Sequence, residues 1–142
     1  MKNKTPVFTF LDHTADLMVR IRGNSLTELF ENAGRAFIHL LIRTGPGGKP
    51  DYLKVSLTGT DLEDLMVRWL SEILYLLDGE NLAVTSVRID SIYRNRLEST
   101  LGTYRFNPNI HELLTEIKAV TYHQIKVTEK RGIWEATITF DT

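Results

Sequence analysis

Hydrophobic residues recur with helical spacing in two segments, and each segment begins with a polar capping pattern. In the first, Ser25 and Glu28 have the spacing of a capping box. Its apolar positions are Leu26, Leu29, Phe30, Ala33, Phe37, Leu40 and Leu41. In the second, Thr60 and Glu63 repeat the capping box. Its apolar positions are Leu62, Leu65, Met66, Trp69, Leu70, Ile73, Leu74 and Leu77. Both patterns predict amphipathic helices with one buried face.

The rest of the chain mostly shows the short or alternating apolar runs of β-strands. These runs are residues 7–11, 17–21, 53–57 and 82–106, and the part after residue 117. Turns are expected near Asn95 and at residues 129–132, and residues 107–117 are expected to form a polar loop or a short helical turn. The pattern predicts an α+β fold with two helices packed on one face of a largely antiparallel β-sheet.

Composition narrows the class of protein. With 142 residues and 42% hydrophobic content, the chain is expected to form a single domain over residues 1–142. The absence of cysteine excludes disulfides, zinc-thiolate sites and cysteine nucleophiles. No stretch approaches the roughly 18 apolar residues of a membrane span, and the N-terminal residues lack the apolar core of a signal peptide. We therefore expect a soluble cytoplasmic protein without a membrane partner.

Charge and motif content argue against several activities. The formal net charge of -1 provides no global field for a phosphate backbone, so a stand-alone RNA binder is disfavoured. Residues 44–50 are rich in glycine, but Pro50 follows Lys49 where a phosphate-binding loop needs Ser or Thr. The four histidines have no metal-binding spacing, and no GxSxG motif supports a serine nucleophile.

Polar residues gather in three places that a strand-rich core does not need, namely residues 12–16, 118–123 and 140–142. The predicted last strand places four apolar residues on one face: Trp134, Ala136, Ile138 and Phe140. Burial of that face would hold Asp141 and the α-carboxylate of Thr142 in place. Neighbouring carboxylates repel unless a cation or a basic side chain lies between them, and their oxygens suit calcium, magnesium or manganese. A merely solvated acidic end is the alternative that composition leaves open.

These segments resemble the archease family. The matching residues are DHTAD at 12–16, GNSLTELF at 23–30, DLEDLMVRWLSEIL at 61–74, His111, EIKAVTYH at 116–123 and FD at 140–141. Their order and spacing make the combination specific, and the resemblance spans nearly the whole chain. One departure is Thr142, where an aliphatic residue such as Ile is expected, and this matters little if the residue binds through its backbone or terminal carboxylate.

The resemblance implies a fold, a site and a partner. It implies two helices against a mixed sheet, a metal site built from Asp16, Asp141 and Thr142, and an essential basic residue at Lys118. The expected cofactor is a divalent metal ion, calcium in the first place, with magnesium or manganese as alternatives. Archeases activate the GTP-dependent RNA ligase of the RtcB type, which joins RNA halves during tRNA splicing. They promote guanylylation of the ligase histidine and sustain multiple turnover. The chain would then be an activator of an RNA ligase and not an enzyme, and it would meet tRNA only through the ligase.

The basic residue and the other polar residues of these motifs can be given chemical roles. Lys118 could contact phosphate or a partner carboxylate, or it could form a salt bridge that neutralises the acids. His13, Thr14, Tyr122 and His123 are expected to orient the acids and not to ligate the metal. Two other functions stay open: a small metal-dependent enzyme, and a chaperone-like modifier of another RNA enzyme such as a tRNA methyltransferase.

Overall fold

The computed structural model describes residues 7–11, 16–45 and 47–142. The elements are β1 (Phe8–Leu11), β2 (Leu17–Gly23), α1 (Leu26–Leu41), β3 (Ile42–Thr44), β4 (Asp51–Thr58), α2 (Leu62–Glu80), β5 (Leu82–Tyr93), β6 (Arg96–Arg105), β7 (His111–Leu113), β8 (Ala119–Lys130) and β9 (Ile133–Asp141). The strands form a four-stranded sheet in the order β1-β2-β9-β8, a three-stranded sheet in the order β4-β6-β5, and the pair β3-β7. All the described pairings are antiparallel.

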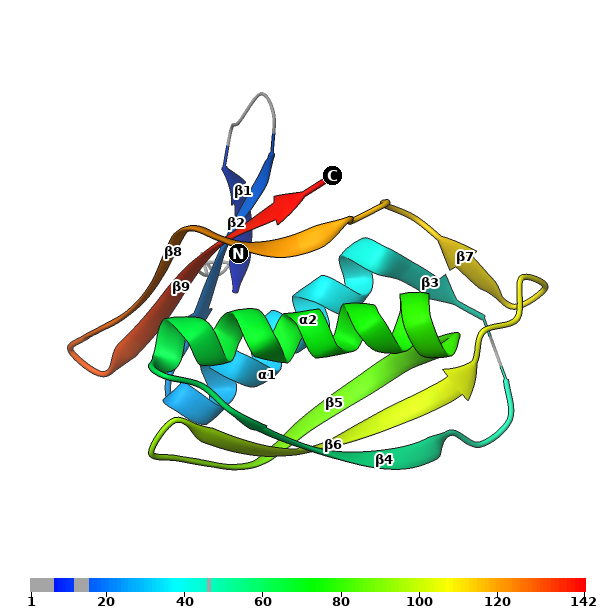
Figure 1. Cartoon of the computed structure of the whole chain (residues 1–142), viewed down its shortest axis with the longest axis horizontal. Helices are drawn as coiled ribbons and strands as arrows, with labels where there is room; N and C mark the ends of the chain where they lie inside the picture. Colours follow the sequence, from blue (N-terminus) through cyan, green and yellow to red (C-terminus); the bar gives the residue numbers. More distant parts are fainter. Residues whose placement is uncertain (1–6, 12–15, 46) are drawn as a thin grey trace, which may run out of the picture.

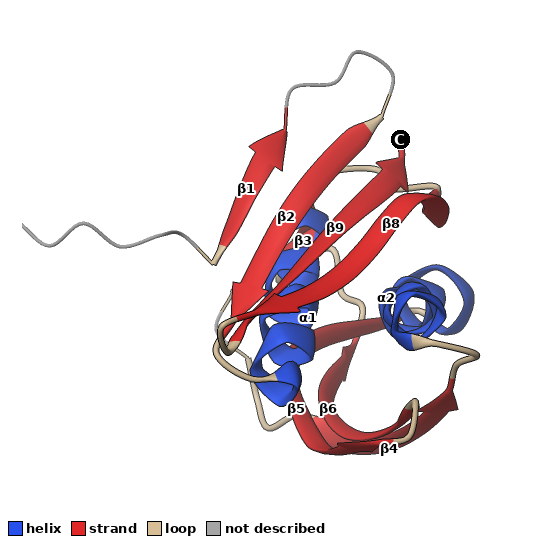
Figure 2. Cartoon of the chain, turned by 90° about the vertical axis from the view of Figure 1, so that its left-hand side faces the viewer, coloured by secondary structure: helices blue, strands red, loops and turns tan. Residues whose placement is uncertain are grey.

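The two helices lie between the two larger sheets, as Figures 1 and 2 show from perpendicular directions. Helix α1 packs against β5 on one side and β2 on the other, and α2 packs against β8, β5 and β4. The predicted α+β class and the antiparallel pairing are confirmed. The sheet is divided in two, so both faces of the helix layer are covered and the core is shared by all three layers.

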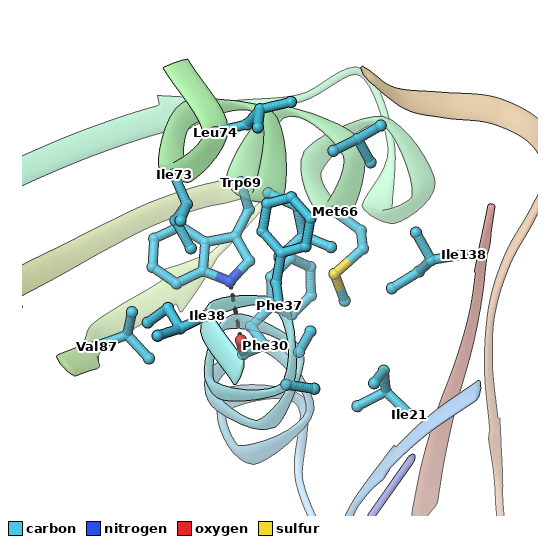
Figure 3. Close-up of a cluster of buried hydrophobic side chains, with 14 of the residues drawn as sticks. Ile21, Phe30, Phe37, Ile38, Met66, Trp69, Ile73, Leu74, Val87 and Ile138 are labelled. Carbon is cyan, nitrogen blue, oxygen red and sulfur yellow. Dashed lines mark hydrogen bonds between the residues drawn. The ribbon is translucent and has the colours of Figure 1, made fainter. Parts of the chain in front are cut away.

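Aromatic side chains join the two helices to each other and to the four-stranded sheet (Figure 3). Trp69 is fully buried, and its indole N–H donates a 2.8 Å hydrogen bond to the carbonyl oxygen of Phe30. The ring of Phe37 stacks on that of Phe140 with 4.9 Å between centroids. A Cβ atom at Gly34 would lie 3.1 Å from the Trp69 ring, so the glycine lets α1 approach the indole. The core therefore fixes α1, α2 and β9 relative to one another.

The N-cap predicted for α1 is confirmed at Ser25, while Glu28 reaches back one residue further than in a standard capping box. The Ser25 hydroxyl accepts from the Glu28 N–H at 3.0 Å, and the Glu28 carboxylate accepts from the Asn24 N–H at 2.8 Å. The first of these bonds satisfies a backbone donor that the first turn of a helix leaves without a partner, and the second ties the residue before the N-cap to the helix.

The capping box predicted for α2 was wrong by one residue. The N-cap is Asp61, whose carboxylate accepts from the Asp64 N–H at 2.7 Å, while Asp64 accepts from the Thr60 N–H at 2.9 Å. Asp and Thr both serve as N-caps, so the sequence offered two registers. The carboxylate of Glu63 is used elsewhere, since it accepts from the Val127 N–H of β8 at 3.1 Å.

The hairpin turns lie where the sequence placed them. Arg94 and Asn95 join β5 to β6, and Arg131 and Gly132 join β8 to β9, all four with positive φ as such two-residue turns require. The segment 107–117, by contrast, contains the short strand β7 paired with β3. The glycine-rich run connects strand β3 to strand β4, so no helix follows it as in a phosphate-binding loop. Within the described residues, no helix combines the length and apolarity needed to cross a bilayer.

We predict that Trp69→Phe lowers the free energy of unfolding by about 2 kcal/mol. About 1 kcal/mol comes from the lost bond to Phe30, and the remainder from the void beside a smaller ring. Urea unfolding measures the change. Trp134→Phe is the matched control, because Trp134 is only half-buried and should lose clearly less. Equal losses in the two variants would contradict this account of the core.

Candidate functional site

Strand β9, one of the two inner strands of the four-stranded sheet, runs between the segments that carry the other predicted site residues. Strand β9 pairs with β2 on one side in a register that sets Leu17 opposite Phe140. The residue before Leu17 is Asp16 and the residue after Phe140 is Asp141, so the two acids are neighbours across the strands. Such neighbours lie close enough for their side chains to interact, and like charges destabilise each other. This end of the sheet therefore concentrates negative charge.

The other neighbour of β9 brings Lys118 to the same place. Strand β8 sets Ala119 opposite Asp141, and the Lys118 N–H donates to the Asp141 carbonyl oxygen at 2.7 Å. Asp16 is half-buried, whereas Lys118, Asp141 and Thr142 are exposed. Lys118 forms no ion pair with any carboxylate in the described part of the chain. Its contact with the acids is thus through the backbone, and its ammonium group does not neutralise them.

The donor set at this strand end suits a hard divalent cation. Asp16 and Asp141 offer carboxylate oxygens, and Thr142 adds another oxygen one residue further on. Among the described residues, no three His, Asp or Glu side chains come together as a metal cluster. A cation would therefore need Thr142 or a further oxygen besides the two aspartates. His13 and Thr14, which were predicted to orient the acids, lie outside the described residues.

A wide bulge interrupts β8 just after the KAVTYH motif. The register passes from Thr121 opposite Thr139 to Lys126 opposite Thr137, so four residues of β8 face a single residue of β9. Gln124 within the bulge has a positive φ of 54°. Bulges re-aim side chains. Here the hydroxyl of Tyr122 donates a 2.6 Å hydrogen bond to the carboxylate of Asp64 at the start of α2.

Asp64 is held as a buried, ionised carboxylate. Only 8% of the residue is exposed, and besides Tyr122 it accepts from the Thr60 N–H and from Arg68 Nε, each at 2.9 Å. The hydrogen bond from Tyr122, then those from Thr60 and Arg68, hold the pKa of Asp64 well below its usual value. The same bond raises the pKa of Tyr122. Asp64 is therefore a structural anion and not a general base.

The structure thus gives Tyr122 a partner that sequence reasoning missed. The i, i+4 spacing of Asp64 and Arg68 on a helix was a visible signal for their ion pair. The bond from Tyr122 spans 58 residues and has no local signal. His123 is exposed and its backbone N–H donates to the Thr121 hydroxyl at 3.3 Å. Its orienting role toward the acids stays a prediction.

Comparison with known proteins identifies the class to which this chain and its fold belong. A model of the Archease protein family (MTH1598/TM1083) matches residues 8–142. The protein archease of Methanosarcina acetivorans is 34% identical over 145 residues, which cover 99% of each chain. That of Sulfurisphaera tokodaii is 33% identical over 135 residues, covering 94% of this chain and 97% of the relative.

Two solved structures share the fold. Protein 1598 of Methanobacterium thermoautotrophicum superposes with a TM-score of 0.74 at 25% identity, covering 96% of this chain and 99% of that one. A Thermotoga maritima protein described as an archease and possible chaperone has a TM-score of 0.66 at 25% identity, covering 100% and 99%. The chain belongs to the archease family, as the resemblance in the sequence predicted.

We predict that Asp64→Asn lowers the melting temperature at pH 7 and flattens its dependence on acid pH. The folded-state pKa of Asp64 lies below the unfolded value near 3.8, so its stabilisation is present above that value. It is lost as the pH falls from about 4 towards the folded-state pKa. Thermal unfolding followed by circular dichroism from about pH 7 to pH 2 should show the curves of wild type and variant converging in acid.

Asp51→Asn is the control, because Asp51 is an exposed acid on β4. Its curve should follow wild type throughout. Parallel curves for wild type and Asp64→Asn would show that Asp64 does not carry this acid sensitivity.

Proposed function

We propose that this protein activates a GTP-dependent RNA ligase of the RtcB type by promoting guanylylation of the ligase histidine, which sustains multiple turnover. The ligase would carry GTP and tRNA, and the protein would act in the cytoplasm as an accessory factor without turnover of its own. The observation that carries the proposal is the convergence of β2, β9 and β8, which sets Asp16, Asp141 and Lys118 at one end of the sheet.

Lys118 is suited to act on a partner. It is exposed, and no described carboxylate neutralises its ammonium group. A lysine ammonium is a compact point charge that binds phosphate or a carboxylate. The backbone bond to Asp141 holds the base of this side chain beside the acids. We therefore assign Lys118 to contact the ligase or the phosphates of its bound nucleotide.

The acids are suited to hold a divalent cation at the same end of the sheet. Asp16 and Asp141 would bind it through carboxylate oxygens, and Thr142 through a further oxygen. A bound divalent cation supplies positive charge that stabilises developing negative charge on phosphate oxygens. Calcium is the first candidate, and magnesium and manganese are the alternatives. The strand ends would supply the positioning, since Asp16 and Asp141 lie directly beyond the last residue pair of the β2-β9 ladder, Leu17 and Phe140.

We predict that the protein accelerates covalent transfer of GMP to its partner ligase and that Lys118→Ala reduces this acceleration at least tenfold. The melting temperature should stay close to that of wild type, because substitutions at exposed positions usually change stability by less than about 0.5 kcal/mol. Lys126→Ala, at an exposed lysine in strand β8, which follows Lys118 directly, is the control and should keep full activity.

Radiolabelled GTP and the ligase from the same genome provide the assay, and the protein is also incubated alone with nucleotide and RNA. Absence of acceleration by wild type would overturn the proposal. Product formed by the protein alone would favour the metal-dependent enzyme. If Lys118→Ala lost acceleration of GMP transfer only in proportion to a lower melting temperature, Lys118 would have a structural role.

We also predict that Asp16→Asn and Asp141→Asn each weaken binding of a divalent cation at least tenfold while the fold is kept. Each substitution removes one charged oxygen ligand and leaves a side chain of the same size. Calorimetric titration with calcium, magnesium and manganese measures the affinities, with Asp51→Asn as the control. Equal affinities in wild type and both variants would remove the cation site from this strand end.

A further inference from the structure

An apolar groove of about 510 Å³ lies beside Lys118. Its walls come from the end of α1, the second half of α2 and segment 113–118, which runs from the last residue of β7 to the start of β8. Figure 1 shows this segment running past the end of α1. The apolar residues that line it are Leu41, Leu74, Leu77, Leu113, Leu114 and Ile117. Leu113 is 60% exposed and Leu114 is 42% exposed, so these two large side chains face solvent.

The groove is held open by fixed backbone contacts. The Leu114 N–H donates to the Leu41 carbonyl oxygen at 2.9 Å, and the Lys118 N–H donates to the Asp141 carbonyl oxygen at 2.7 Å. Between these two anchors Ile117 is buried in the core. Segment 113–118 is therefore positioned before anything binds, which lowers the entropic cost of binding.

The charged residues around the groove indicate which kind of ligand would bind there. Its charged lining residues are Asp78, Glu116 and Lys118, and all three are exposed. Asp78 and Glu116 form no ion pair with any residue that the structure describes. Two exposed carboxylates without an ion-pair partner lie beside a surface lined by leucines. Such a surface is complementary to a segment that carries apolar side chains and a basic residue.

The position of the charges also favours a polypeptide over a small molecule. Small-molecule sites place a few polar groups inside the pocket, where they fix the ligand. Here the three charged side chains are exposed, and the buried part of the lining is formed by Leu41, Leu74 and Ile117. Apolar anchors surrounded by exposed charge are the pattern of a protein interface.

We propose that this groove docks an apolar segment of the ligase that carries a Lys or Arg directed at Asp78 and Glu116. The inference rests on the proposed function, because Lys118 belongs both to the groove and to the site at the strand end. Docking in the groove sets affinity for the ligase, while Lys118 and the acids act on guanylylation once the complex has formed.

The test separates affinity from maximal activation. The ligase is titrated with wild type, Leu114→Asp, Leu113→Asp and the double variant Asp78→Lys with Glu116→Lys, and binding is measured by calorimetry in parallel. We expect each variant to raise the concentration for half-maximal activation and the dissociation constant at least tenfold, with an unchanged rate at saturation. Ile133→Ser and Asp51→Lys are matched controls at an exposed aliphatic and an exposed acidic position away from the groove, and both should behave as wild type.

The outcomes distinguish the two proposals. If wild type fails to activate the ligase, the proposed function fails. If wild type activates it and the groove variants titrate as wild type does, the groove is not the docking site. The docking proposal would also be overturned if the control variants weakened ligase binding as much as the groove variants do. Loss of self-association or of small-molecule binding without loss of ligase binding would assign the groove to a second copy or to another ligand. If Leu114→Asp unfolds the protein, the double variant Asp78→Lys with Glu116→Lys, whose positions are both exposed, decides whether the groove binds the ligase.

Discussion

The register of β9 is the constraint on which the site depends. Ala136, Ile138 and Phe140 are buried against the helices, and the ring of Phe140 stacks on Phe37 of α1. Side chains alternate along a strand, so a shift of one residue would turn all three towards the opposite face of the sheet. The free-energy cost of that exposure fixes where β9 ends. It therefore fixes where Asp141 meets the strands on either side.

Parts of this arrangement could be predicted from the sequence because they follow from local or periodic patterns. The N-cap at Ser25 and the burial of alternate residues in β9 are of this kind. The bond between Tyr122 and Asp64 and the bulge in β8 could not be predicted, because they depend on how α2 packs against a strand far along the chain. The division of the strands into two larger sheets could not be predicted for the same reason, because the packing of the whole core determines which strands pair. Asp16 and Asp141 were predicted as site residues from the family resemblance together with the strand pattern.

Segment 113–118, which runs from the last residue of β7 to the start of β8, links the proposed docking groove to the site at the strand end. At one end it pairs with β3 and bonds to the last residue of α1, and at the other it bonds to the strand that carries Asp141. The proposed docking surface and Lys118, the residue proposed to act on the ligase, are thus parts of one short stretch of chain. Under the proposed function, this geometry is how a protein of near-neutral charge, with no phosphate-binding loop in its sequence, would influence a nucleotide bound to the ligase.

The bulge in β8 also has a consequence for the protein as a free molecule. Strand β8 is an edge of the four-stranded sheet, and an edge strand offers a row of backbone donors and acceptors to any passing chain. Four successive residues that leave the register, one of them with a positive φ, break that row in the middle. The exposed part of β8 is then too irregular to template a continuous new strand. The feature that directs Tyr122 to Asp64 thereby also protects this edge against sheet-to-sheet aggregation.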